Sequence, residues 1–178
     1  MSKAFLFILV SFALSGCISA YQEPSGSGTA SLKIEGALPS GTLTMESYAD
    51  RSCQSPSQMG AIGMVFDRDL QKKIPAGREF VLTGNWMGIR FAANVLCSST
   101  VTFVPEAARD YVATFAVSPD EHSCSLAIGQ RTGAGVKPVS FRKNDALCST
   151  FTRLGPKHNG VAMVRVYTAT VSTYTARR

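Results

Sequence analysis

The chain has 178 residues, of which 45% are hydrophobic, and carries a formal net charge of +6. A chain of this length suits one domain with a proper core, because it buries roughly two thirds of its unfolded surface. A second full domain is therefore not expected.

The amino terminus has the layout of an export signal: Lys3 precedes an apolar run from Ala4 to Ala13. The run has about half of the ~20 residues that a membrane-spanning helix needs, which argues against a permanent span. It leads into Leu14, Ser15, Gly16 and Cys17. We therefore expect a cleaved signal peptide over residues 1–16.

Leu14 to Cys17 resembles the lipobox of bacterial lipoproteins, in which an aliphatic and two small residues precede a cysteine. The resemblance implies a thioether lipid on Cys17, cleavage before it, and an acyl chain such as palmitate on the freed amine. No aspartate follows Cys17, which in these families favours the outer membrane, on the leaflet facing the periplasm. The alternative is an ordinary secretory signal with a chance cysteine.

Four cysteines remain after Cys17, namely Cys53, Cys97, Cys124 and Cys148. An even number in an oxidising compartment predicts two disulfides, for which three connectivities exist. We favour sequential pairs, Cys53 with Cys97 and Cys124 with Cys148, because such pairs suit adjacent strands and loops. A zinc site lacks every usual spacing, so neither a metal nor a cofactor is expected.

Residues 17–30 form the lipidated cysteine and a predicted flexible linker rich in Gly, Ser and Pro, and residues 31–178 form the predicted domain. Period-two alternation begins with Leu32 and Ile34 opposite Lys33 and Glu35. Further strands are predicted at 42–48, 62–66, 79–82, 86–91, 99–104, 111–117, 124–128, 136–142 and 162–175. Short strands at roughly ten-residue spacing predict an all-β fold, an antiparallel β-sandwich of about eight or nine strands.

Two stretches, Asp67 to Lys73 and Pro105 to Arg109, each have room for about one turn of helix. The second belongs to a run from Thr102 to Tyr111 that resembles the strand, proline turn and tyrosine strand of transthyretin-like and immunoglobulin-like secreted domains. Ala108 and Arg109 stand where those domains usually have a glycine before the tyrosine.

No catalytic motif is present in the sequence, neither Gly-x-Ser-x-Gly nor His-Glu-x-x-His. Gly129 to Gly135 is glycine-rich but lacks the Gly-Lys-Ser/Thr ending of a phosphate loop, so a hairpin turn is favoured. Asp120, Glu121 and His122 offer acid and base groups, although Pro119 and Asp120 are also ordinary turn residues. The lone Trp86 is expected in the core.

From Arg131 onward, nine basic residues stand against one acid. This segment predicts a surface for an anionic partner, such as headgroups, lipid phosphates or an acidic protein, unless the arginines are simply solvated. Nucleic acid is not expected for an exported, anchored domain. The candidate surface residues are Arg131, Lys137, Arg142, Lys143, Arg153, Lys157 and Arg165.

Export, anchoring, disulfides and the lack of a catalytic constellation favour a non-enzymatic binding or structural module of the cell envelope. A hydrolase using Asp120, Glu121 or His122 is the alternative of a different class. A third hypothesis is a protein inhibitor that presents a disulfide-pinned loop near Cys53.

Overall fold

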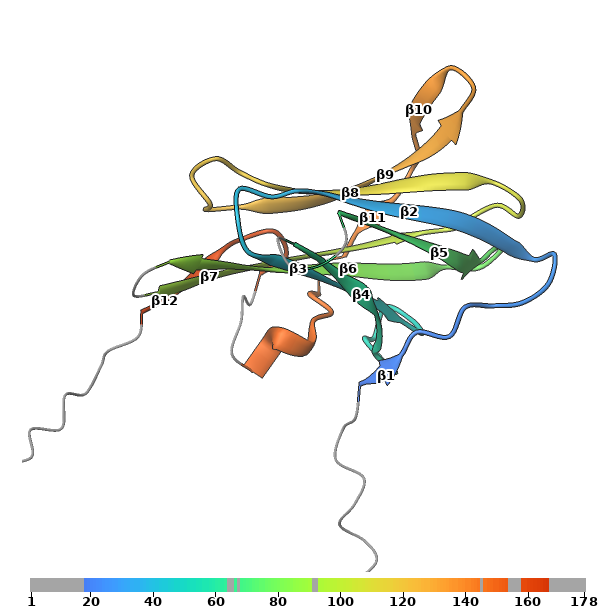
Figure 1. The fold of residues 1–178 in the computed structure, drawn as a ribbon. Helices are drawn as coiled ribbons and strands as arrows, with labels where there is room; N and C mark the ends of the chain where they lie inside the picture. Colours follow the sequence, from blue (N-terminus) through green and yellow to red (C-terminus); the bar gives the residue numbers. More distant parts are fainter. Residues whose placement is uncertain are drawn as a thin grey trace, which may run out of the picture.

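The computed structural model describes residues 18–63, 66, 68–90, 93–144, 146–153 and 158–166, and they form two packed β-sheets (Figure 1). The first sheet has the order β1 (Ser19–Ala20), β4 (Ser57–Gly63), β3 (Thr42–Tyr48), β6 (Phe80–Arg90), β7 (Ala93–Phe103) and β11 (Arg142–Lys143), with β12 (Met163–Val166) also paired to β7. The second has the order β10 (Gly135–Pro138), β9 (Cys124–Thr132), β8 (Asp110–Val117), β2 (Thr29–Ala37) and β5 (Asp69–Pro75). The predicted all-β fold is confirmed.

The hydrophobic core lies between the two sheets and follows the period-two alternation of their strands. Leu32 of β2 and Phe115 of β8 are fully buried against Leu43 of β3 and Trp86 of β6. The indole N–H of Trp86 donates to the backbone oxygen of Ser40 at 2.7 Å, which satisfies its one polar atom inside the core. The prediction of a core tryptophan is confirmed.

The pairing differs from a purely antiparallel sandwich at two places. β2 lies parallel to β8, and β1 lies parallel to β4, while the other strand pairs are antiparallel among the residues described. The parallel β2–β8 pair lies at the centre of the second sheet. β5 pairs antiparallel with β2 on one side, and β9 pairs antiparallel with β8 on the other.

Strand boundaries follow the local pattern most closely where polar and apolar residues alternate strictly. β3 covers 42–48 as predicted, whereas the predicted strands at 79–82 and 86–91 are one continuous strand, β6. Gly84 lies inside this strand rather than in a turn. A Cβ atom there would come within 2.5 Å of the Phe115 ring, so the glycine allows the second sheet to pack closely.

Both expected helical turns are wrong. Asp69–Pro75 forms β5, whose residues pair with β2 from Thr29 to Glu35, because a partner strand outweighs weak local helix propensity. Asp67 lies outside the described residues. Residues 105–109 form a turn in which Ala108 has φ 57° and the Tyr111 hydroxyl accepts the Glu106 N–H at 2.9 Å. Ala108 thus takes the left-handed conformation in the place of the expected glycine.

The glycine-rich segment 129–135 is a hairpin turn, as predicted. β10 folds back on β9 with Val136 opposite Arg131, and this hairpin projects from the second sheet (Figure 1). The strand predicted at 136–142 divides into β10 and β11, and the Val139 N–H after β10 still donates to Ile128 O at 3.2 Å. Of the strand predicted at 162–175, the described part is β12.

Candidate functional site

The loops of the sandwich gather at two ends, and the chain enters at one of them. Loop 49–56, turn 76–79 and loop 104–109 join strands at this end, where β3, β5 and β7 finish and β4, β6 and β8 begin. We call it the anchor end, since the residues next to Cys17 lie there. Cys17 itself is outside the described residues.

The first part of the predicted linker is ordered on the surface of the domain. β1 pairs with β4, and Ser19 Oγ donates to the backbone oxygen of Pro56 at 3.3 Å. Tyr21 packs against the core, its N–H donates to Gln58 O at 2.9 Å, and its hydroxyl donates to Lys73 O at 2.9 Å. The linker was predicted from composition alone. Composition does not show that the pairing of β1 with β4 and the contacts of Tyr21 hold this short segment on the domain.

Glu23 extends this attachment. Its carboxylate accepts the Lys73 N–H at 3.1 Å and lies 3.6 Å from the Lys72 ammonium nitrogen. The pKa of Tyr21 is raised to about 12. Burial is the main cause, and the negative charge of Glu23 adds more to the pKa than the nearby Arg78 takes from it. Residues 19–23 are therefore part of the folded domain, and the flexible composition is confined to the residues that follow.

Two surface hollows lie at the anchor end, and both include Glu79. The first, of about 440 Å³, lies between the ordered segment at Tyr21 and the side chains of Tyr48 and Phe80. The second, of about 560 Å³, is lined by residues that include Val104 and Phe141. Glu79 accepts hydrogen bonds from Arg51, and this ion pair stands between the two hollows.

The disulfides are Cys53–Cys148 and Cys97–Cys124, so the sequential pairing that we favoured is wrong. Cys97 points into the core and reaches Cys124 of the opposite sheet, with 6.1 Å between their Cα atoms. Cys53 and Cys148 lie on the outer side of the first sheet. A Cys53–Cys97 bond would have to pass through the sheet, because side chains on one strand alternate between its two faces.

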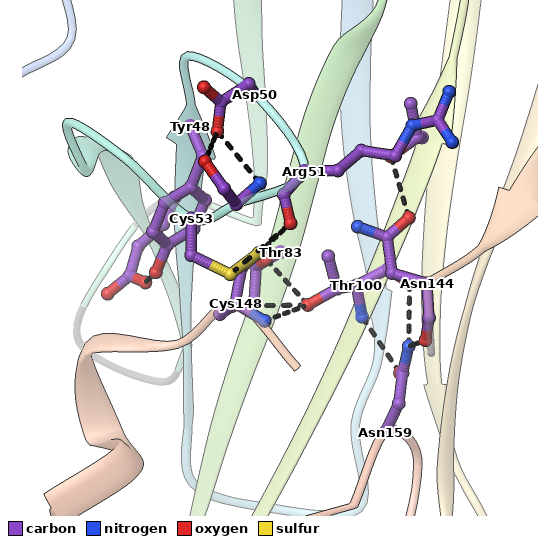
Figure 2. Close-up of a disulfide and its surroundings, with 12 residues drawn as sticks. Tyr48, Asp50, Arg51, Cys53, Thr83, Thr100, Asn144, Cys148 and Asn159 are labelled. Carbon is purple, nitrogen blue, oxygen red and sulfur yellow. Dashed lines mark hydrogen bonds between the residues drawn. A yellow bond between two sulfur atoms is a disulfide. The ribbon is translucent and has the colours of Figure 1, made fainter. Parts of the chain in front are cut away.

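The Cys53–Cys148 bond fixes a carboxy-terminal segment over the outer face of the first sheet (Figure 2). Its described residues are 144, 146–153 and 158–160, and we call them the cover. Thr100 is its central contact: the hydroxyl donates to Cys148 O and lies 2.9 Å from that of Thr83. The Asn159 amide accepts the Thr100 N–H at 3.0 Å and donates to Thr100 O at 2.9 Å. Asn159 thus pairs with the edge of β7 as a neighbouring strand would, in the gap between β11 and β12.

The buried outer face is built from uncharged polar side chains, with one carboxylate. Glu46 is 2% exposed and accepts hydrogen bonds from the Tyr48 hydroxyl at 2.6 Å and from the N–H and hydroxyl of Thr150. Burial, followed by the bond to Glu46, raises the pKa of Tyr48 above its usual range. Ser149 donates to Asn85 Oδ1 at 2.6 Å beside this group.

Sequence reasoning missed this polar layer, although a signal for it exists. The outward positions of β6 and β7 carry Thr83, Asn85, Ser98, Thr100 and Thr102, where a solvated strand usually carries Lys or Glu. Uncharged side chains at consecutive outward positions indicate a face that is covered, because small polar groups can be satisfied by hydrogen bonds when buried.

The structure does not bring the predicted basic surface together as one patch. Arg131 and Lys137 lie on the β9–β10 hairpin, where Arg131 is 3.9 Å from Glu35. Arg142 pairs opposite Thr102 and Arg165 opposite Asn94, about 26 Å apart along β7 at the usual rise per residue. Lys143 adjoins Arg142, Arg153 lies in the short 3-10 helix Thr150–Arg153, and Lys157 is outside the described residues.

Asp120, Glu121 and His122 form a solvated turn at the end opposite the anchor end. The Asp120 carboxylate accepts the Ser118 hydroxyl at 2.5 Å and the His122 N–H at 3.1 Å, and these bonds lower the pKa of Asp120. Glu121 pairs with Arg90 at 2.6 Å. Both carboxylates are thus engaged in holding the turn.

Within the described part of the chain, no three His, Cys, Asp or Glu residues gather as metal ligands, and no helix is long and apolar enough to span a membrane. Comparison with known proteins assigns no family, since no family model matches the sequence and no curated protein matches it.

Proposed function

We propose that the chain is the precursor of a bacterial lipoprotein whose β-sandwich is a non-enzymatic binding or structural module of the cell envelope. The observation that carries the proposal is the lipobox sequence ending at Cys17, which one residue separates from an ordered strand that begins at Ser19. Two disulfides, Cys53–Cys148 and Cys97–Cys124, are consistent with an oxidising compartment such as the periplasm. The residues after Cys17 favour the outer membrane.

The membrane attachment is tested with Cys17→Ala in cells labelled with radioactive palmitate. The variant should incorporate no palmitate, and any exported protein should leave the membrane fraction, because the lipid chains supply the attachment. Ser19→Ala is the matched control, since Ser19 makes only exposed hydrogen bonds, and it should keep its label. Labelling of the Cys17→Ala protein would contradict the proposal.

The binding role rests on the β9–β10 hairpin, which projects from the sandwich. In this hairpin Val136 is 58% exposed, pairs opposite Arg131 and is followed by Lys137. An envelope protein with an acidic surface, or an anionic envelope component, complements it. A photo-crosslinking residue at Val136 should capture one specific envelope component, and Arg131→Ser with Lys137→Ser should abolish the capture. Crosslinks to abundant neighbours alone, unchanged by these substitutions, would contradict this role.

An inhibitor that presents loop 49–56 is the second candidate. The loop is fixed at Cys53, and both Cys53 and Ser55 have left-handed φ angles, 63° and 50°. We rank it second because this loop lies beside the proposed lipid attachment, where a large enzyme has little room to approach.

A further inference from the structure

The direction of β1 determines where the lipid on Cys17 leaves the domain. β1 runs parallel to β4, with Ser19 opposite Ser57, the first residue of β4. The chain therefore enters the sheet at the start of β4, beside loop 49–56. Two residues of extended chain span about 7 Å at most. A lipid on Cys17 would thus start within that distance of Ser19, at the anchor end.

Because Tyr21 and Glu23 hold the following residues on the domain, little free chain remains between the lipid and the fold. A long flexible linker would let the domain turn freely some 20 Å from the bilayer, as expected from composition alone. The ordered segment instead restricts the domain to orientations in which the anchor end is close to the membrane.

The anchor end also carries the side chains that a bilayer interface accepts. Ile18, Val104 and Phe141 are exposed there, at 44%, 52% and 40% of their surfaces. Arg78 and Arg142 are exposed beside them. Apolar side chains enter the headgroup boundary, while arginines contact lipid phosphates.

Three acids at this end are held by local partners. Glu79 is paired with Arg51, and Glu106 lies 3.6 Å from Arg109. The Asp50 carboxylate accepts the N–H and hydroxyl of Ser52. Of the acids at this end, Asp110 at the start of β8 is exposed.

We propose that the anchor end lies directly against the bilayer, with Ile18, Val104 and Phe141 in the headgroup boundary of an anionic lipid surface. This inference rests on the proposed lipidation of Cys17. The opposite end, with loop 118–123, then points away from the membrane and is presented to other components.

The test uses lipidated, full-length protein in nanodiscs of phosphatidylcholine with phosphatidylglycerol, compared with the same protein in detergent micelles. Amide hydrogen exchange should slow on the nanodiscs in loop 49–56, turn 76–79 and loop 104–109. Loop 118–123, at the opposite end, should exchange equally in both. Equal exchange throughout, or slowing at loop 118–123 instead, would overturn the proposal.

A double variant, Val104→Asp with Phe141→Asp, should lose this slowing while staying in the membrane fraction. Both side chains are exposed, so the fold is retained. Val161→Asp is the matched control that should keep the slowing, because Val161 is 51% exposed and lies beside Ser123 at the opposite end. If amide exchange in the anchor-end loops of the double variant were still slowed, the proposed contact of Val104 and Phe141 with the lipids would be wrong. Intact mass of the starting protein separates the two proposals: an unlipidated protein refutes the proposed function, whereas a lipidated protein with unprotected anchor-end loops refutes the orientation alone.

Discussion

The Cys53–Cys148 disulfide should be the main covalent support of the domain, and its loss has a magnitude that the structure allows us to work out. It joins residues 95 apart in the sequence, and the Cys97–Cys124 bond, with a separation of 27, is nested inside it. In the chain-entropy model the outer loop alone contributes about 4.7 kcal/mol, and the inner crosslink reduces this to about 4 kcal/mol. That is a large part of a typical domain stability of about 5–15 kcal/mol.

Cys53→Ser with Cys148→Ser should therefore lower the free energy of unfolding in urea by about 4 kcal/mol. At a slope of about 2 kcal/mol/M, the midpoint falls by about 2 M. Cys148 is completely buried among polar neighbours, so serine fits its place without an apolar cavity. A loss below about 1 kcal/mol would refute the chain-entropy reasoning.

Loss of each disulfide should also accelerate amide exchange in a different part of the domain. Without Cys53–Cys148, amide exchange should accelerate in the cover and at Thr100, whose hydroxyl accepts the Cys148 N–H at 3.2 Å. Without Cys97–Cys124, exchange should accelerate in the core strands β7 and β9. A non-reducing peptide map that shows Cys53 joined to Cys97 would refute the pairing from which both expectations are derived.

Three further predictions concern single side chains. Ala108→Gly should stabilise the domain by up to about 1 kcal/mol in urea unfolding, because glycine takes φ 57° without the strain that alanine carries, at a smaller entropic cost. Asn159→Ala should cost about 1–3 kcal/mol, since it leaves the buried Thr100 N–H unpaired while the Thr100 C=O keeps the Asn144 N–H, whereas exposed His158→Ala should stay within about 0.5 kcal/mol. Tyr21 is protonated in the fold up to a pKa of about 12 against 10.0 when unfolded. Stability should therefore be level below pH 10.0 and fall as the pH rises through about 12, and Tyr21→Phe should weaken that fall in alkaline denaturation monitored by tyrosinate absorbance.

Local pattern was sufficient to predict the strands with strict alternation. β3 was predicted at its observed boundaries, and Trp86 was placed in the core from its type and surroundings. Turn chemistry was equally informative at 129–135, where glycines without a following helix indicated a hairpin. These features depend on neighbours in the sequence, which is why they are readable from it.

Pairing between distant segments was not predictable in the same way. The strand Asp69–Pro75 has weak propensity of its own and is extended because β2 offers a full ladder. The face of β7 to which Cys97 points is indicated by Val101 and Phe103, which stand at even spacing from it and lie in the same core. The partner of Cys97 was not predictable in this way, because Cys124 lies on the opposite sheet and its position depends on how the two sheets pack.

The docked amino-terminal segment changes what the lipobox implies for the whole molecule. A lipid on a free linker attaches a domain to a membrane but does not fix the orientation of the domain. Here Tyr21 donates to Lys73 O and packs on the core, so the attachment point and the sandwich move as one body. The anchor end then faces the lipids, and loop 118–123 at the opposite end faces away from them. The β9–β10 hairpin projects from the second sheet at the edge far from β1, on the anchor-end side (Figure 1). Weakening this attachment with Tyr21→Ala should therefore reduce the protection of loop 104–109 on nanodiscs without releasing the protein from the membrane, because the lipid stays while the orientation is lost.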